Sequence, residues 1–290
     1  MASPREIRRR IKSIGSTAQI TRAMQMVAAS KMRKAQEATL VTRPFGQLLY
    51  RIQRRVTTHL PDFSHPLMEV REVRKRVVLL VGTDKGLCGS LNTNLFRVAS
   101  QYDPETTLYI AVGKRAAQFV ARARRNLAAE FTIKDSPQFA EARPIARMAR
   151  DLFLNREADQ VAVVATRFIN TLNQQACSVE FLPIGEIKSL KIPGAESEAG
   201  LAADTTEVIY EPSPQAVLDY LFAGYLNIMM YRVLLEAKAS EQSARMVAMT
   251  NATDNATELI KDLTLEYNKL RQGNITKELL EIAGGQLGAA

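Results

Sequence analysis

Residues 235–270 read LEAKASEQSARMVAMTNATDNATELIKDLTLEYNKL, and this stretch decides the fold. It lies inside a longer run, residues 215–283, that contains no proline and only two glycines, Gly224 and Gly273. Such a run predicts one continuous helix, on the order of 100 Å long at a rise of about 1.5 Å per residue. That length exceeds the diameter of an ordinary domain, so we expect part of the helix to project from the globular body.

Selected residues of the long helix recur at alternating steps of three and four, the spacing of a left-handed coiled coil. This seam consists of Leu235, Ala239, Gln242, Met246, Met249, Thr253, Ala256, Ile260, Leu263, Tyr267 and Leu270. The same spacing occurs near the amino terminus, at Ile7, Ile11, Ile14, Ala18, Thr21, Gln25, Ala28, Met32 and Ala35. We therefore expect a helix over residues 5–59 to pair with the longer helix, which outruns it by a few turns; if the two run antiparallel, one tip stands alone. The alternative is an ordinary amphipathic helix packed on the chain's own core.

Composition indicates a folded protein that is made and kept in the cytosol. The chain has 290 residues, 46% of them hydrophobic, which suffices for a sizeable core. It has no run of eighteen apolar residues and no apolar signal segment at the amino terminus, so we expect it to meet membranes only through partners. Its only cysteines are Cys88 and Cys177, its only histidines His59 and His65, and neither disulfide nor metal chemistry is expected.

The net charge of +9 is concentrated on the first helix. Residues 1–60 hold thirteen Lys and Arg against two Asp and Glu, whereas residues 61–214 are balanced and residues 215–290 are slightly acidic. A helix this basic is expected to meet nucleic acid, anionic lipid or an acidic protein surface, unless it is simply solvated. Apolar residues surround most of the helix over residues 20–32, which favours enclosure by other protein or burial against the chain's own domain.

The middle of the chain predicts a separate α/β domain. Strands are expected at residues 76–82, 108–112, 160–165 and 178–182, and helices at 90–100, 114–125 and 141–155. This alternation predicts a largely parallel sheet with helices on its faces. We divide the chain into a helix at 1–60, an α/β domain with its connecting segment at 61–214, and a helix at 215–290.

The loop after the first strand carries Gly82, Gly86 and Gly89, but their spacing matches neither a dinucleotide fingerprint nor a P-loop. Glycines that allow a tight turn explain the loop better than phosphate binding. Cys88 has no histidine with a sequence-level reason to lie beside it, and no pair of carboxylates stands out for acid–base work. The domain is therefore interpreted as a scaffold without a catalytic site, metal or cofactor.

Five separated blocks carry a family resemblance. They are ITRAMQMVAASKMRKAQ at 20–36, TDKGLCGSLN at 83–92, RFINTL at 167–172, ASEQSARMVAM at 239–249 and ITKELLEIAGG at 275–285. In this order they resemble the gamma subunits of bacterial F-type ATP synthases, the central rotor shaft. The resemblance implies an antiparallel coiled coil of the two end helices with a Rossmann-like α/β domain at its foot.

The resemblance also implies partners and a role. The shaft is expected to turn inside a hexamer of alpha and beta subunits, one copy per complex, with its foot on the epsilon subunit and the membrane ring of c subunits that proton flow drives. This would place the chain at the cytoplasmic face of the bacterial inner membrane as a peripheral protein. It would couple proton flow to ATP synthesis without chemistry of its own.

Individual positions carry over from the same resemblance as contacts to the alpha and beta subunits. They are Arg8, Arg9, Arg10, Met24, Arg33, Lys34, Lys85, Gln242, Arg245, Gln272, Thr276 and Glu278. A nucleic-acid-binding coiled-coil protein remains as the alternative, which requires a steep salt dependence of oligonucleotide affinity. A dinucleotide-dependent enzyme is a weaker alternative because the glycine fingerprint fails.

Overall fold

The computed structural model describes residues 3–59, 65–184, 211 and 213–287. Within its helices, the side chains of residues 42–59, 214, 215, 218, 277, 278 and 281–287 lie outside this description. Most of the predicted connecting segment before the long helix also lies outside it. The chain separates into two compact units, residues 1–29 with 245–290 and residues 30–244, and each is described by itself.

Two long helices flank the other elements along the chain. Helix α1 spans Pro4–His59, and helix α5 spans Pro214–Leu287 with 74 residues, so the predicted long helices are confirmed. Helix α1 runs through Pro44 without ending there. Each of the two helices contributes one part to each unit.

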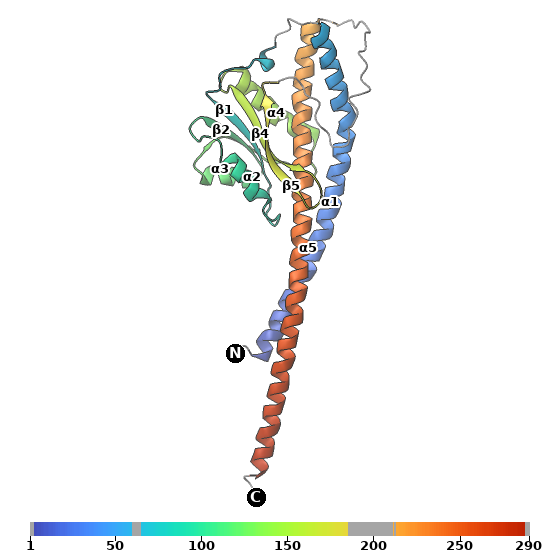
Figure 1. The fold of residues 1–290 in the computed structure, drawn as a ribbon, viewed down its shortest axis with the longest axis vertical. Coiled ribbons are helices and arrows are strands. Elements are labelled where there is room, and N and C mark those ends of the chain that lie inside the picture. Colours follow the sequence, from blue (N-terminus) through green and yellow to red (C-terminus); the bar gives the residue numbers. More distant parts are fainter. Residues whose placement is uncertain (1–2, 60–64, 185–210, 212, 288–290) are drawn as a thin grey trace. The chain divides into compact units, whose positions relative to one another are not determined.

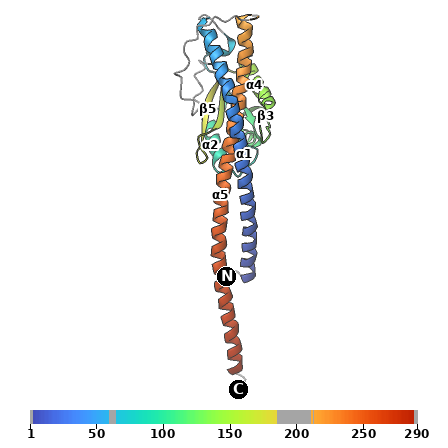
Figure 2. The ribbon, with the colours of Figure 1, turned by 90° about the vertical axis from the view of Figure 1, so that its right-hand side faces the viewer.

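The first unit is an antiparallel pair of helices. Figures 1 and 2 show α1 beside α5, with α5 continuing past the start of α1. Every predicted seam position of this unit is buried or half-buried, from Ile7 to Ala28 on α1 and from Met246 to Leu270 on α5. Thr21 and Thr253 join across the seam through their hydroxyl oxygens, 2.7 Å apart. The predicted coiled-coil spacing is therefore confirmed, and it ends at Leu270, after which every described side chain is exposed.

The second unit is built on a five-stranded sheet with the order β3-β2-β1-β4-β5 (Figure 1). The strands are β1 (Arg76–Val81), β2 (Thr107–Val112), β3 (Asn126–Phe131), β4 (Gln160–Phe168) and β5 (Gln174–Leu182). Strands β1 to β4 pair in parallel, and β5 pairs antiparallel with β4. The four predicted strands are confirmed. Strand β3 was not predicted, because its sequence NLAAEF is rich in residues that favour helix and it lies exposed at the sheet edge.

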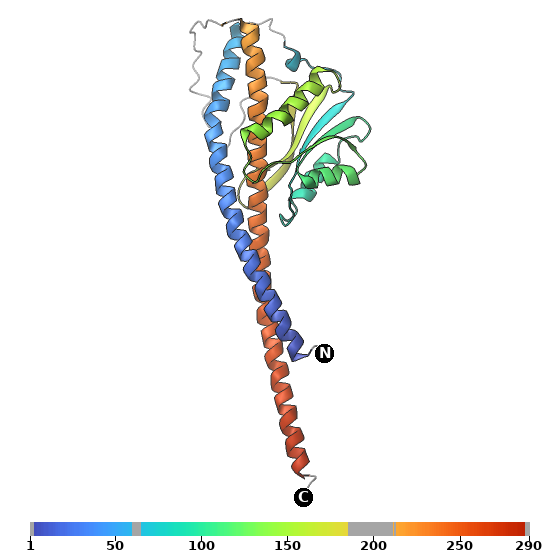
Figure 3. The same ribbon diagram turned by 180° about the vertical axis from the view of Figure 1, so that it is seen from behind.

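Helices cover both faces of the sheet (Figure 3). Helices α2 (Leu91–Ala99) and α3 (Lys114–Arg122) pack on one face, against Val78, Leu80 and Tyr109. Helix α4 (Phe139–Leu154) packs on the other face, against Val77 and Leu79. The first turns of α5 share that second core through Phe222, Tyr225, Leu226, Met230 and Leu234. The amino-terminal part of α5 is therefore a core helix of the sheet body.

A histidine anchors the beginning of α5 to the segment before the sheet. His65 is 7% exposed and precedes the short 3-10 helix η1 (Pro66–Met68). Its Nδ1 accepts a hydrogen bond from the Leu67 backbone at 3.1 Å, so its Nε2 carries the proton and donates to Asp219 Oδ1 at 2.8 Å. Burial raises the pKa of the neighbouring core residue Tyr225 to about 12.

Candidate partner-binding surfaces

The basic residues predicted on α1 are exposed. In the first unit this holds for Arg8, Arg9 and Arg10, and in the second unit for Arg33 and Lys34. None of the five forms an ion pair with another side chain in the described part of the chain. Met24 is half-buried. These cations are available to an acidic partner, although a single exposed ion pair is worth only about 0–1 kcal/mol.

Apolar side chains lie beside these cations on α1. Ile20 is 60% exposed, Met26 is 62% exposed and Val27 is 53% exposed. An isolated helix pair gains nothing from presenting three large apolar side chains to water within two turns. Exposed apolar side chains grouped in this way make this part of α1 a candidate contact surface.

The carboxy-terminal end of α5 presents a second apolar surface. Ile275 is 48% exposed, Leu279 is 61% exposed and Leu280 is 68% exposed. The predicted contact residues Gln272 and Thr276 are also exposed, and Thr276 donates its hydroxyl proton to the Gln272 carbonyl at 3.0 Å. The side chain of Glu278, the third predicted residue here, lies outside the described residues. This end of α5 has no helix beside it within the described part of its unit (Figure 2).

Two further predicted contact residues are almost fully enclosed. Gln242 is 3% exposed and Arg245 is 8% exposed. Gln242 also belongs to the predicted seam, which agrees with its burial. Neither side chain offers more than a small fraction of its surface to a partner in this conformation.

The loop between β1 and α2 is held by side-chain hydrogen bonds and exposes one leucine. Thr83 donates its hydroxyl proton to the Lys85 carbonyl at 2.8 Å, and Asn92 Nδ2 donates to Thr83 Oγ1 at 2.8 Å. Lys85 is exposed as predicted for a contact residue, and Leu87 is 62% exposed with a φ of 61°. A leucine in the left-handed region is strained, and such strain is characteristic of functional positions.

Packing explains Gly82, at the start of this loop, and Gly113, which directly precedes α3. A Cβ at Gly82 would lie 3.0 Å from the Ala116 Cβ, so the strand end and the start of α3 approach too closely for a side chain. Gly113 has a φ of 94°, and a Cβ there would lie 2.8 Å from the Gly82 carbonyl oxygen. The close approach of backbone to backbone requires both glycines. Within the loop itself, Gly89 has a φ of 59°, which agrees with the interpretation of the loop as a tight turn.

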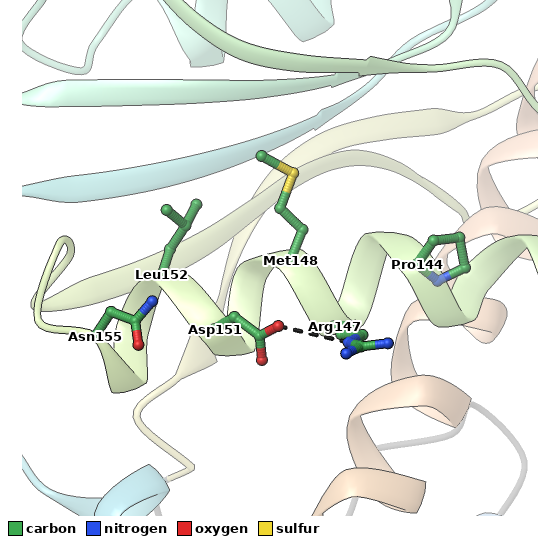
Figure 4. A pocket seen from close by; sticks show the side chains of 6 residues that line it. All are labelled: Pro144, Arg147, Met148, Asp151, Leu152 and Asn155. Carbon is green, nitrogen blue, oxygen red and sulfur yellow. Dashed lines mark ion pairs between the residues drawn. The ribbon is translucent and has the colours of Figure 1, made fainter.

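A depression runs along the outer side of α4, lined by Pro144, Arg147, Met148, Asp151, Leu152 and Asn155. Figure 4 shows Met148 and Leu152 on the side of the sheet, where they pack against the core. Arg147 and Asp151 lie away from it and form an ion pair at 3.6 Å. All six residues come from one helix. The depression therefore lies on the surface of a single helix, and its lining brings no reactive groups together.

Sequence reasoning missed a polar segment of α5 that is enclosed within the second unit. Lys238 and Glu241 are 2% and 3% exposed and form an ion pair at 3.0 Å. Ser240 and Ser243 are both completely buried. The sequence signal was present, since six consecutive residues from 238 to 243 include five polar ones in the middle of an otherwise apolar stretch.

Charged groups from other elements surround this segment. The hydrogen bond from Lys31, 2.6 Å long, lowers the pKa of Asp135 below its ordinary value, and the charges of Lys238 and Lys85 add to that effect. Burial raises the pKa of Glu236, and the charge of Arg167 opposes that shift. Residues from α1, two loops and α5 therefore interact electrostatically here.

Other kinds of site find little support in the described residues. They contain no cluster of three histidine, cysteine or carboxylate side chains placed to hold a metal ion. Cys88 is buried against Leu91 and Ala244, and burial raises the pKa of the Cys177 thiol. No described helix has the length and apolar character needed to cross a bilayer.

A family model and several known proteins match this chain over nearly its whole length. The ATP synthase family model matches residues 3–287. The ATP synthase gamma chain of Opitutus terrae is 44% identical, with all of both chains covered, and that of Roseiflexus castenholzii is 45% identical over 98% of each.

Solved structures agree on the fold. A chain in the rotational state 3 structure of the Euglena gracilis mitochondrial ATP synthase, which includes OSCP, F1 and the c-ring, has a TM-score of 0.68. It is 21% identical, with 98% of this chain and 94% of that chain covered. A chain of the Tetrahymena thermophila mitochondrial central stalk and c-ring has a TM-score of 0.61 at 24% identity, covering 80% of this chain and 99% of the other. On the evidence of the family model and of these full-length relatives, the chain belongs to the family of ATP synthase gamma chains.

Proposed function

We propose that this chain is the central-stalk rotor subunit of a proton-translocating F-type ATP synthase. The observation that carries the proposal is the extent of the match, which includes both long helices as well as the sheet body. Rotation of the chain would couple proton flow through the membrane ring to ATP synthesis on the beta subunits. The ring itself would consist of c subunits.

The proposed partners of the helices are the alpha and beta subunits, arranged as a hexamer around one copy of this chain. Exposed apolar residues on α1 and at the end of α5 support this, because both surfaces leave large side chains in water. The unpaired cations of α1 support an acidic lining of the hexamer's cavity. The epsilon subunit and the ring are proposed to hold the foot, with no nucleic acid involved.

At the level of residues, the proposed hexamer contacts fall into three groups. The first group is on α1, the second is the exposed Lys85 in the β1–α2 loop, and the third is on α5. Their members are Arg8, Arg9, Arg10, Met24, Arg33 and Lys34; Lys85; and Gln242, Arg245, Gln272, Thr276 and Glu278. For Gln242 a direct contact requires its side chain to leave its enclosed position. The proposed contacts to the hexamer therefore rest mainly on the exposed residues of these three groups.

The proposed mechanism needs no chemistry on this chain. Helices α1 and α5 present unlike surfaces, one basic and apolar, the other ending in an apolar tip. As the shaft turns, each beta subunit meets these surfaces in sequence and changes its nucleotide affinity accordingly. The chain would thus be a subunit of an enzyme complex without a catalytic site or cofactor, held at the cytoplasmic face of the inner membrane through its partners.

The proposed division of labour follows the three segments predicted from the sequence. Residues 1–60 and 215–290 would form the shaft, and residues 61–214 the foot. The part of α5 over residues 222–234 belongs to the core of the sheet body, so the shaft and the foot share this helix.

Native mass spectrometry of the complex tests this proposal. The complex is purified through a tag on this chain, and we expect three alpha chains, three beta chains and one copy of this chain. Recovery of the chain without alpha and beta subunits would overturn the proposal. Recovery of an oligonucleotide in stoichiometric amount would favour the nucleic-acid alternative.

A further inference from the structure

A short segment of α5, residues 236–243, contacts its surroundings through polar groups where the turns before it use apolar ones. Leu234 and Leu235 are buried apolar residues, and Phe222, Tyr225, Leu226 and Met230 precede them. From Lys238 onward the enclosed side chains are mostly polar. Polar contacts constrain the orientation of a helix in a way that apolar packing does not.

One face of this segment is bonded to the hairpin formed by β4 and β5. Ser240 donates its hydroxyl proton to the Thr166 carbonyl at 3.1 Å, and Ser243 donates to the Thr171 carbonyl at 2.7 Å. Gln174 Nε2 donates to Ser243 Oγ at 3.3 Å, and an ion pair at 3.8 Å joins Arg167 to Glu236. The helix positions used are 236, 240 and 243, which lie on one side of α5 because each residue turns about 100°.

The opposite face carries the buried ion pair. Positions 238 and 241 lie on average about 160° around the helix from the hairpin-facing positions. There Lys238 Nζ lies 3.0 Å from Glu241 Oε2, and the charge of Lys238 acts on Asp135 in the loop before α4. Asp135 in turn accepts a hydrogen bond from Lys31 of α1 at 2.6 Å.

These contacts differ from apolar packing because their strength depends on the direction of the bond. Apolar contacts depend on buried area and are non-directional, whereas hydrogen bonds weaken steeply as their angles change. A turn of α5 about its own axis by a few tens of degrees would break its bonds to the hairpin. The Lys238–Glu241 pair joins two residues of the same helix and would turn with it.

We propose that residues 236–243 form a torque clamp that fixes the rotational position of α5 against the β4–β5 hairpin. Ser240 and Ser243 are the positioning residues, and the Arg167–Glu236 ion pair lies on the same side of the helix. The inference rests on the proposed rotor function, because only a chain under torsional load needs such a clamp. Torque entering at the foot passes through these bonds into the part of α5 that follows.

The test uses Ser240→Ala combined with Ser243→Ala in the assembled complex. These changes remove two bonds to backbone carbonyls and almost no volume. ATP hydrolysis without a proton gradient is expected to stay at the wild-type rate, whereas ATP-driven proton pumping against a growing gradient should fall by at least about fivefold, the factor that corresponds to losing one of the two hydrogen bonds at about 1 kcal/mol. The matched control is Ser100→Ala with Thr106→Ala, which removes two exposed hydroxyls far from α5 in sequence and should change neither rate.

A second arm separates a clamp from a general structural role. Arg167→Cys and Glu236→Cys are added to the double variant with the native cysteines replaced, and a short bismaleimide bridges them after assembly. Bridging should restore pumping under load, since the hairpin and helix are again fixed to each other. A folding defect would not respond, because the complex is already assembled when the bridge forms.

The outcomes are distinguishable from failure of the rotor proposal. If the wild-type complex itself does not pump, the proposed function fails. If wild type pumps and the serine variant pumps equally well under load, or if the bridge does not restore pumping, the clamp is refuted. If the double variant assembles poorly, the single variants Ser243→Ala and Gln174→Ala take its place. Each should show a smaller loss of pumping under load. If both pump at the wild-type rate, the clamp is refuted.

Discussion

Two isoleucines on α1 offer a matched pair for testing whether a partner covers the helix. Ile7 is 1% exposed and Ile20 is 60% exposed in the free chain, and both belong to the first unit. Ile7→Ala and Ile20→Ala remove the same atoms from the same helix. Any difference between the variants therefore reflects what surrounds each side chain.

The expected magnitudes follow from the exposed fractions. Removing three buried carbons costs about 2.4 kcal/mol in transfer free energy at about 0.8 kcal/mol each. Ile7→Ala should cost at least this much, and up to about 5 kcal/mol once the remaining cavity is included. Ile20→Ala should cost the free chain about 1 kcal/mol, because less than half of its side chain is covered. The other part, about 1.4 kcal/mol, is lost only when a partner covers the residue, and it corresponds to about tenfold in affinity.

Two assays read these effects separately. Hydrogen exchange of the free chain over the first turns of α1 reports local stability, and it should accelerate strongly for Ile7→Ala and little for Ile20→Ala. Competition between isotopically labelled wild-type and variant chains for limiting alpha and beta subunits reports assembly. There Ile20→Ala should be under-represented by about tenfold.

The reasoning fails if Ile20→Ala competes equally with wild type for the alpha and beta subunits. In that case Ile20 faces solvent in the complex, and the exposed apolar residues of α1 are not a contact surface. It also fails if Ile20→Ala accelerates exchange as much as Ile7→Ala, since the packing of the seam would then differ from that described.

Three further changes test other parts of the structure. In urea denaturation, Gly113→Ala should destabilise the chain by about 2 kcal/mol or more, because Gly113 has a φ of 94° and closely approaches the Gly82 backbone. Gly224→Ala should stabilise the chain by about 0.5–1 kcal/mol, because the helical Gly224 has open space around it. Equal effects of the two changes would contradict this account of the packing around Gly113. Asp135→Asn should lower the melting temperature at pH 7, and this difference should shrink as the pH falls below 3.8, since a carboxylate with a lowered pKa stabilises the fold above its ordinary pKa of 3.8 and loses that contribution as the pH falls through its lowered pKa; a difference that does not shrink on acidification would exclude the ion pair with Lys31 as its source. Replacing the five predicted contact cations of α1 by Gln should weaken assembly or proton pumping, whereas single replacements should be mild, and an unaffected quintuple variant would remove these five cations from the contact surface. The five are Arg8, Arg9, Arg10, Arg33 and Lys34.

Periodicity predicted the helices because the seam pattern is local and long. The alternation from Ile7 to Ala28 and from Met246 to Leu270 depends only on helix geometry, so the buried stripe could be inferred without knowing its partner. Buried strands such as β1 and β4 were equally visible, since both faces of a central strand are apolar.

The features that were not predicted depend on tertiary context. Strand β3 forms because β2 offers it a parallel partner, although its own residues favour helix. The polar residues around Ser240 are visible in the sequence, but their bonding partners are not, since these are the backbone carbonyls of Thr166 and Thr171, more than seventy residues away. The burial of Arg245, predicted as a partner contact, likewise became visible only in the structure.

Rotation of this chain relative to the alpha and beta subunits is the central claim, and single-molecule microscopy measures it most directly. Gln101 is exposed on the sheet body, so Gln101→Cys, with Cys88 and Cys177 replaced, can carry a bead while the complex is fixed to a surface through its beta subunits. With ATP present, we predict rotation of the bead in one direction that stops when ATP is removed. A bead that stays fixed while the same complexes hydrolyse ATP would contradict the claim.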